Sequence, residues 1–258
     1  MPLILSLFPG IGLLDMAFEQ EGFCIVRGPD VLWGGDIKTF FPPAGKFDGV
    51  IGGPPCQAFS RPRHLVEHNG YVIAENLIPE FSRVVEAARP DWFLMENVPG
   101  APDPLLPMYD VERFAFNNRW TGADQNRMRW FWWGSWHGRP LGRVSKYIEL
   151  AALESATVEP AVCASGGAAP VPVRIGGSGK VKRSFTARHV AIRKSASAMG
   201  YKTIGYLRDA CRLQGLPADF LDHAPFTVAG KIKCVGNGVP LPMGYAIVQA
   251  VKRAISCR

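Results

Sequence analysis

The sequence has 258 residues, of which 47% are apolar and 20% charged, which excludes a mainly disordered chain and suits one large domain or a domain with a small lobe. Lysines and arginines number 29 against 22 aspartates and glutamates, so the net charge of +7 favours a polyanionic partner without proving one. No apolar run approaches the ~18 residues of a membrane span, and the six cysteines form no Cys-x-x-Cys pair, so we expect a cytoplasmic protein that neither enters a membrane nor binds zinc.

Short apolar segments bounded by turn residues recur along the chain and are typical of buried strands. We expect strands at residues 3–8, 23–26, 47–51, 92–95 and 128–133. Apolar residues spaced for one helix face predict helices at residues 14–21, 74–88, 205–220 and 239–256. Gly22 is suited to end the first of these helices. This alternation of strands and helices predicts an α/β fold with a mostly parallel sheet covered by helices on both faces.

The stretch between residues 138 and 205 differs from the rest of the chain. It contains the glycine-rich runs Ser165–Pro170 and Gly176–Gly179, many basic residues and no clear period. We interpret 138–205 as a small irregular lobe. Residues 1–137 should then form the main domain, and residues 206–258 should return to it.

The first place where chemistry could occur is the turn Phe8–Gly12, between the first strand and the first helix. Its glycines let a ligand approach the backbone, and the start of the following helix favours an anionic group. Asp15 stands where a dinucleotide-binding loop would have a third glycine, which suits a ligand without a pyrophosphate, such as S-adenosylmethionine. A tight turn without any ligand is an equally open interpretation.

Cys56 lies in the segment Gly52–Ser60, immediately after a predicted strand. Two glycines and two prolines before it predict a rigid turn that presents the thiol at the edge where open α/β sheets bind ligands. Arg61 and Arg63 nearby would favour the thiolate, which points to a nucleophile and away from a buried, inert cysteine.

Glu96 follows the apolar strand predicted at residues 92–95, and a carboxylate at the end of a buried strand is costly unless it has a partner or a function. In the predicted sheet it shares the edge of Cys56, so the two suggest a nucleophile and an acid facing one pocket. Arg127 and Arg129 lie two apart and should share one face of a strand. They could bind a phosphate or a base carbonyl, although an exposed basic strand end is as compatible with the pattern.

Six segments, taken in order, resemble the characteristic blocks of the DNA cytosine-5 methyltransferases. They are Phe8-x-Gly10-x-Gly12, Pro55-Cys56-Gln57, Glu96-Asn97-Val98, Gln125-x-Arg127-x-Arg129, Arg212–Pro217 and Gly236-Asn237-Gly238-Val239. The resemblance implies a Rossmann-like methyltransferase domain. The unmatched stretch 138–205 lies where this family keeps its variable target-recognition domain.

The resemblance also assigns catalytic roles. Cytosine C5 becomes nucleophilic only after a thiolate has added to C6, and Cys56 would be that thiolate. Glu96 would hydrogen-bond or protonate N3, and Arg127 and Arg129 would hold O2 and stabilise developing negative charge. The target cytosine would have to be flipped out of double-stranded DNA, at a cost of about a few kcal/mol.

S-adenosylmethionine is the cofactor that the resemblance implies. Asp30 is the only acidic candidate for holding the ribose hydroxyls, and only five residues separate it from Asp36, too few for the helix usual in the family. The pocket should therefore be more open, and a modified sulfonium cofactor is a narrower alternative. The implied cofactor-binding residues are Phe8, Gly10, Gly12, Asp30, Asp36, Ile37, Pro55 and Asn237.

A monomer acting on double-stranded DNA is the expected assembly. His64 and His68 lack a third ligand, so we expect no metal. The residues expected to contact DNA come from the loop after Cys56 and from the basic lobe. They are Gln57, Ser60, Arg61, Arg63, Lys180, Lys182 and Arg183.

Two other functions are compatible with the same blocks. An RNA cytosine-5 methyltransferase of the tRNA-modifying branch would carry a Cys-Phe-Thr segment before the last blocks, and this sequence has none. A non-catalytic DNA-binding homologue would show degraded catalytic blocks, whereas here Cys56, Glu96, Arg127 and Arg129 are all present.

Overall fold

The computed structural model describes residues 1–59, 75–144, 159–162 and 204–256. The chain divides into two compact units. Unit 1 comprises residues 1–116, 128–145 and 244–258, and unit 2 comprises residues 117–127 and 146–243. This division differs from the sequence-based boundaries, because residues 206–243 group with unit 2 and only the last part of the chain returns to unit 1.

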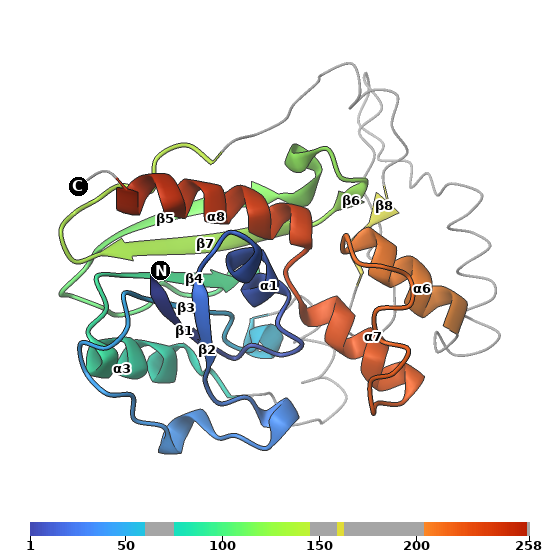
Figure 1. Cartoon of the computed structure of the whole chain (residues 1–258), viewed down its shortest axis with the longest axis horizontal. Coiled ribbons are helices and arrows are strands. Elements are labelled where there is room, and N and C mark those ends of the chain that lie inside the picture. The colour runs from blue at the N-terminus through green and yellow to red at the C-terminus, as the bar shows by residue number, and fades with distance from the viewer. Residues whose placement is uncertain (60–74, 145–158, 163–203, 257–258) are drawn as a thin grey trace. The chain divides into compact units, whose positions relative to one another are not determined.

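Six strands form the sheet of unit 1: β1 Leu3–Leu7, β2 Cys24–Arg27, β3 Gly49–Gly52, β4 Trp92–Asn97, β5 Asp110–Asn117 and β7 Met128–Ser135. Their order is β2-β1-β3-β4-β7-β5 (Figure 1). The pairs β1–β2, β1–β3 and β3–β4 are parallel, and β7 runs antiparallel to β4. The sheet is thus mostly parallel, as the sequence predicts.

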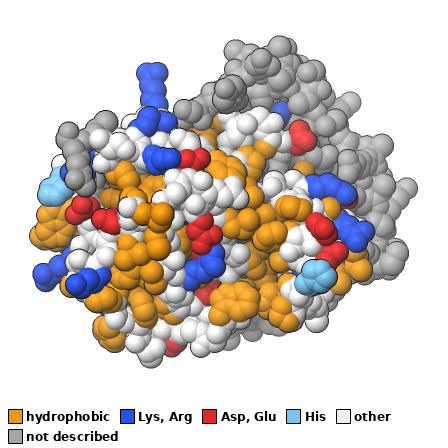
Figure 2. Space-filling model, in the orientation of Figure 1, with side chains coloured by type: hydrophobic (Ala, Val, Ile, Leu, Met, Phe, Trp, Pro, Cys, Tyr) orange, Lys and Arg blue, Asp and Glu red, His pale blue; other side chains and the backbone are white. Residues whose placement is uncertain are grey.

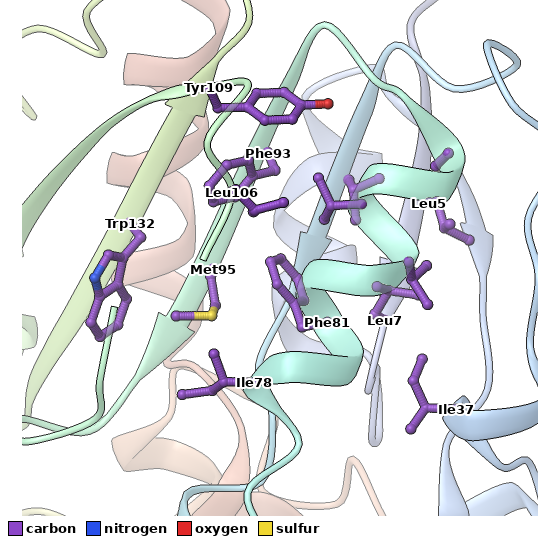
Figure 3. Close-up of a cluster of buried hydrophobic side chains, with 14 of the residues drawn as sticks. Leu5, Leu7, Ile37, Ile78, Phe81, Phe93, Met95, Leu106, Tyr109 and Trp132 are labelled. Carbon is purple, nitrogen blue, oxygen red and sulfur yellow. The ribbon is translucent and has the colours of Figure 1, made fainter. Parts of the chain in front are cut away.

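Helices cover both faces of this sheet. The three helices are α1 Leu13–Gln20, α3 Ile78–Ala88 and the part of α8 (Leu241–Ser256) that begins at Gly244. Alternate strand residues face α3, where Leu7, Phe93 and Met95 pack around Phe81 in a fully buried cluster (Figure 3). The rings of Phe81 and Phe93 meet edge to face, 5.9 Å apart.

The opposite face of the sheet carries α1 and α8. Trp92 of β4 stacks on Phe18 of α1, with ring centroids 6.3 Å apart. Lys252 of α8 pairs with Glu21 at the end of α1 at 2.8 Å, which ties the C-terminal helix to the first one. Two layers of helices therefore enclose the strands, and the residues that follow the strands remain at the sheet's edges.

Glycines set the ends of α1. Gly12 begins the helix at φ +76°, and Gly22 follows its end at φ +87°, as the sequence predicts. Between β2 and β3 the described chain forms only two 3-10 turns, Val31–Trp33 and Ile37–Thr39. The prediction that no α-helix follows the second strand is therefore confirmed.

Unit 2 contains α6 Ile204–Leu213, α7 Val228–Asn237, the short strands β6 Gln125–Asn126 and β8 Glu159–Pro160, and a 3-10 turn at 118–121. The helix predicted at 205–220 ends earlier because Gly215 adopts φ +78° and Pro217 follows. Two elements, α7 and β5, were not predicted from the sequence. The two glycines in α7 interrupt the helical spacing of its apolar residues, and the charged residues of β5 interrupt the apolar run typical of a buried strand.

Candidate active site

The carboxyl ends of three parallel strands meet at one edge of the sheet. The register pairs Leu7 of β1 with Gly52 of β3, and Gly52 with Met95 of β4. The residues that come directly after this row are Phe8, Gly53 and Glu96. Since β7 is antiparallel to β4, its first residues lie at the same edge, where Trp130 pairs with Asn97. Open α/β sheets bind ligands at such an edge.

Glu96 and Arg129 form an ion pair at this edge. Arg129 Nε lies 2.8 Å from Glu96 Oε1, and only 15% and 10% of the two side chains are exposed. Arg129 Nη1 also donates to the carbonyl of Met128. The pairing explains how a carboxylate is accommodated at the end of a fully buried strand.

Gly53 lies against the other oxygen of Glu96. A Cβ atom built on Gly53 would be 3.1 Å from Glu96 Oε2, closer than most side-chain contacts. Any residue other than glycine would therefore crowd the carboxylate. Arg129 and Gly53 together define where the two oxygens of Glu96 lie.

Asn97 connects the end of β4 to the segment that carries the cysteine, and the sequence analysis gave it no role of its own. Its side chain is 1% exposed, and Nδ2 donates to the carbonyl of Pro54 at 3.0 Å. Its Oδ1 accepts from the amide of Val98 at 2.8 Å. Asn97 thereby fixes the backbone two residues before Cys56. An amide side chain directly after the candidate acid, at the end of an apolar strand, is the signal that could have identified it.

Cys56 begins a 3-10 turn, Cys56–Ala58, and is partly exposed. Pro55 precedes it at φ −50°, and the amide of Phe59 closes the turn on the carbonyl of Cys56 at 2.9 Å. Phe59 packs against the main core, which anchors the far end of the turn. The rigid turn predicted from the prolines is present, and Gln57 beside it is exposed.

Arg127 does not share a strand face with Arg129, and that expectation is wrong. It lies between β6 and β7, so the chain does not run as one strand through both arginines. Its side chain, 2% exposed, belongs to unit 2 and donates there to the carbonyls of Val162, Gly236 and Gly238 at 2.8, 2.8 and 3.0 Å. The last two carbonyls lie at the C-terminal end of α7, where a cation is favourable.

The predicted cofactor loop has three residues with left-handed backbone. Phe8 at φ +54° is one of only two such non-glycine residues in the described chain, and Gly10 and Gly12 have φ +56° and +76°. A Cβ on Gly10 would meet nothing within 4 Å, so open space adjoins the loop there. A non-glycine residue in this conformation is strained, and such strain is often found at ligand-binding sites.

Residues of the 3-10 turn that follows β2 hold Gly10 from both sides. Asp30 Oδ2 accepts from the amide of Gly10 at 2.8 Å, and Oδ1 accepts from the amide of Leu32 at 2.7 Å. Trp33, 59% exposed, donates its indole N–H to the carbonyl of Gly10 at 2.8 Å. Asp30 therefore lies directly beside the loop that is predicted to bind the cofactor.

Asp36 begins the second 3-10 turn and is exposed, with Oδ1 accepting from the amide of Lys38 at 3.0 Å. Ile37, next to it, is buried in the core. Asp15 has a different environment, because it is buried and bonded to Ser6 and Arg27 at 2.5 and 2.9 Å. Burial raises the pKa of Asp15, and these two hydrogen bonds oppose the rise.

The remaining predicted residues are distributed as follows. Asn237 is exposed at the end of α7 in unit 2. Among the described residues, no group of three or more side chains could hold a metal ion, and no helix is long and apolar enough to span a membrane. Several predicted DNA contacts lie outside the described residues, namely Ser60, Arg61, Arg63, Lys180, Lys182 and Arg183. His64 and His68 also lie outside them.

Solved structures similar to this one include methyltransferases. The S. pombe Dnmt2 methyltransferase aligns over 100% of both chains with a TM-score of 0.63 and 13% sequence identity. At that identity the likeness shows the fold alone. The protein thus has the α/β fold of the cytosine-5 methyltransferases.

Sequence comparison defines the family more closely. The model of the C-5 cytosine-specific DNA methylase family matches residues 34–104, which include Cys56 and Glu96. Type II methyltransferase M.HgiGI of Herpetosiphon aurantiacus is 34% identical over 115 residues, covering 36% of this chain and 88% of that protein. Type II methyltransferase M.NgoPII of Neisseria gonorrhoeae is 32% identical over 167 residues, covering 51% of this chain and 47% of that protein. The chain belongs to the C-5 cytosine-specific DNA methylase family, and it spans about half the length of M.NgoPII.

Proposed function

We propose that the protein is a DNA cytosine-5 methyltransferase that uses S-adenosylmethionine. The observation that carries this proposal is the Glu96–Arg129 ion pair at the same sheet edge as the turn of Cys56. A nucleophile, an acid and a cation are the three groups that cytosine C5 chemistry needs. The family membership supports the reaction class.

In the proposed mechanism the Cys56 thiolate adds to C6 of the flipped cytosine, and its electron pair forms the new S–C6 bond. Glu96 takes part in its protonated form and donates its proton to N3, which gains the electron density displaced from the ring when the thiolate adds, while Arg129 remains beside Glu96 Oε1. Arg129 stabilises the charge that develops on O2. S-adenosylmethionine supplies an electrophilic methyl group when it is bound. Water then takes the proton from C5, the C5–C6 double bond re-forms as the S–C6 bond breaks, Cys56 leaves as a thiolate, and the N3 proton returns to Glu96.

The residues around the loop Phe8–Gly12 fit this cofactor. The open space at Gly10 lets a ligand approach the backbone, and the carboxylates of Asp30 and Asp36 suit ribose hydroxyls and an adenine amino group. Asp15 stands where a dinucleotide-binding loop has its third glycine, which argues against a dinucleotide. In this proposal the residues of unit 1 that hold the cofactor are Phe8, Gly10, Gly12, Asp30, Asp36, Ile37 and Pro55, and the role of Asn237 in unit 2 stays a prediction from the sequence.

The charge of the sequence supports DNA as the partner. Residues 163–203 contain eight lysines and arginines and no aspartate or glutamate. In the described part of the molecule, basic and acidic side chains are mixed on the face drawn in Figure 2. The residues proposed to contact DNA are Gln57, Ser60, Arg61, Arg63, Lys180, Lys182 and Arg183. Such binding should weaken as salt increases.

One assay tests both the reaction and the substrate. The purified protein is incubated with S-adenosylmethionine and either duplex DNA or tRNA, and the nucleosides are analysed by mass spectrometry. We expect 5-methylcytosine in DNA, none in tRNA, and loss of the product in Cys56→Ala. Product in tRNA alone would favour the RNA enzyme, and DNA binding without product would favour a non-catalytic homologue. For the modified-cofactor alternative, plasmid DNA from cells that express the protein is analysed in the same way, and an added mass greater than that of a methyl group would indicate a modified sulfonium donor.

A further inference from the structure

Arg83 of α3 is a charged residue that the proposed chemistry does not use. Each arm of its guanidinium nevertheless has a partner. Nη2 donates to the carbonyl of Ile37 at 2.7 Å, Nη1 to the carbonyl of Phe40 at 3.1 Å, and Nε to Glu80 Oε2 at 2.7 Å. Two of the three partners thus belong to the segment that follows Asp36, more than forty residues earlier in the sequence.

These contacts determine the shape of a short irregular segment. The two carbonyls are three residues apart and bracket the 3-10 turn Ile37–Thr39. A planar guanidinium that binds both carbonyls fixes their separation, which a single ammonium group cannot do in the same way. The side chain of Ile37, 4% exposed, is inserted into the core beside α3 (Figure 3). The turn is therefore held through its side chain and through its backbone.

Phe41 completes the arrangement. Its ring centroid lies 4.8 Å from the guanidinium carbon of Arg83, in the range of a cation–π contact. The ring itself is 73% exposed, so this contact is the main interaction that accounts for its position. One side chain of α3 thus organises Ile37, Phe40 and Phe41 together.

We propose that Arg83 is a positioning residue for the cofactor, which acts by holding Asp36 and Ile37 in their binding geometry. This inference rests on the proposed function, in which both residues contact S-adenosylmethionine. Without Arg83 the turn has to be ordered when the cofactor binds, and that ordering weakens affinity. The chemical steps that follow binding, which use Cys56 and Glu96, are unaffected once the cofactor is saturating.

The experiment measures S-adenosylhomocysteine binding by calorimetry, together with the KM for S-adenosylmethionine and kcat. We expect Arg83→Met to raise both Kd and KM roughly tenfold with kcat within about twofold of the wild type. Arg83→Lys, which retains the charge, should give a smaller but measurable rise. Glu80→Gln is the matched control, because it removes the ion pair within α3 and leaves both carbonyl contacts, and it should change Kd by less than about twofold.

Hydrogen exchange of the unliganded proteins gives a readout that does not depend on catalysis. Amides 37–41 should exchange faster in Arg83→Met than in the wild type, while the rest of α3 is unchanged. An Arg83→Met variant that binds as tightly as the wild type, or exchanges no faster at 37–41, overturns the inference, as does a fall in kcat at unchanged KM. A wild-type protein that binds no S-adenosylhomocysteine contradicts the proposed function instead, and the exchange data then still decide whether Arg83 orders the turn.

Discussion

Glu96 and Arg129 are joined by an ion pair of 2.8 Å that is almost entirely removed from solvent. The partners are 33 residues apart in sequence and come from the antiparallel neighbours β4 and β7. Charges in such a place are stable only together, since breaking a buried pair leaves one charge without compensation.

A double-mutant cycle tests this dependence. Arg129→Met should lower the free energy of unfolding by about 3 to 5 kcal/mol, because it leaves the Glu96 carboxylate buried without its cation. Adding Glu96→Gln should recover much of that loss, since the uncompensated charge is removed. Urea denaturation gives the four stabilities. Simple additivity of the two single effects would show that the pair is not coupled. Neither single variant nor the double variant should methylate DNA at a wild-type rate.

Gly53→Ala should impair activity more than stability. The added Cβ would lie 3.1 Å from Glu96 Oε2, so the carboxylate has to shift, and we expect kcat/KM to fall roughly tenfold or more. Gly205→Ala is a matched control in α6, where an added Cβ meets nothing within 4 Å, and it should be neutral or slightly stabilising. Wild-type kinetics in Gly53→Ala would show that this oxygen need not be held in place.

Arg127 should act through the stability of unit 2. Arg127→Met removes three hydrogen bonds, to the carbonyls of Val162, Gly236 and Gly238, of which Gly238 still accepts from Gln214 Nε2 at 3.3 Å. A buried carbonyl left unpaired costs about 1 to 3 kcal/mol, so we expect a loss of about 2 kcal/mol or more in unfolding free energy and faster hydrogen exchange in α7. If Arg127→Met keeps full stability and loses only turnover, the arginine contacts the base after all.

Asp15 should give the protein a pH-dependent stability. Burial raises its pKa in the folded state above the ordinary value of 3.8, so the folded protein binds the proton more tightly than the unfolded chain. The contribution of Asp15 to stability is then largest below pH 3.8 and declines as the pH rises through the folded-state pKa. In urea denaturation from pH 4 to 7, Asp15→Asn should lack this decline. Identical pH profiles for the two proteins would contradict the assignment.

Much of the site could be predicted because it depends on where apolar strands end. Cys56 comes shortly after β3 and Glu96 lies at the end of β4, both strands have an apolar composition, and parallel strands bring their carboxyl ends together. The turn before Cys56 could also be predicted, because prolines restrict the backbone wherever they occur.

Other features depend on tertiary contacts that leave no local pattern. Arg127 and Arg129 look equivalent in the sequence. Because the chain breaks between β6 and β7, Arg127 binds carbonyls of unit 2 and Arg129 pairs with Glu96. Arg83 looks like an ordinary polar residue of an amphipathic helix, because its carbonyl partners lie more than forty residues away.

Covalent trapping of Cys56 tests the central proposal most directly. Duplex DNA with 5-fluorocytosine at the target should stop the reaction after the methyl group is transferred, because C5 then carries fluorine and no proton can leave. The context for that duplex would come from bisulfite sequencing of methylated plasmid. We expect a stable protein–DNA adduct that depends on S-adenosylmethionine, with peptide mass spectrometry locating it on Cys56. The proposal would be contradicted if a protein preparation that methylates the ordinary cytosine duplex formed no adduct with the fluorinated duplex. It would also be contradicted by an adduct on another residue that persists in Cys56→Ala.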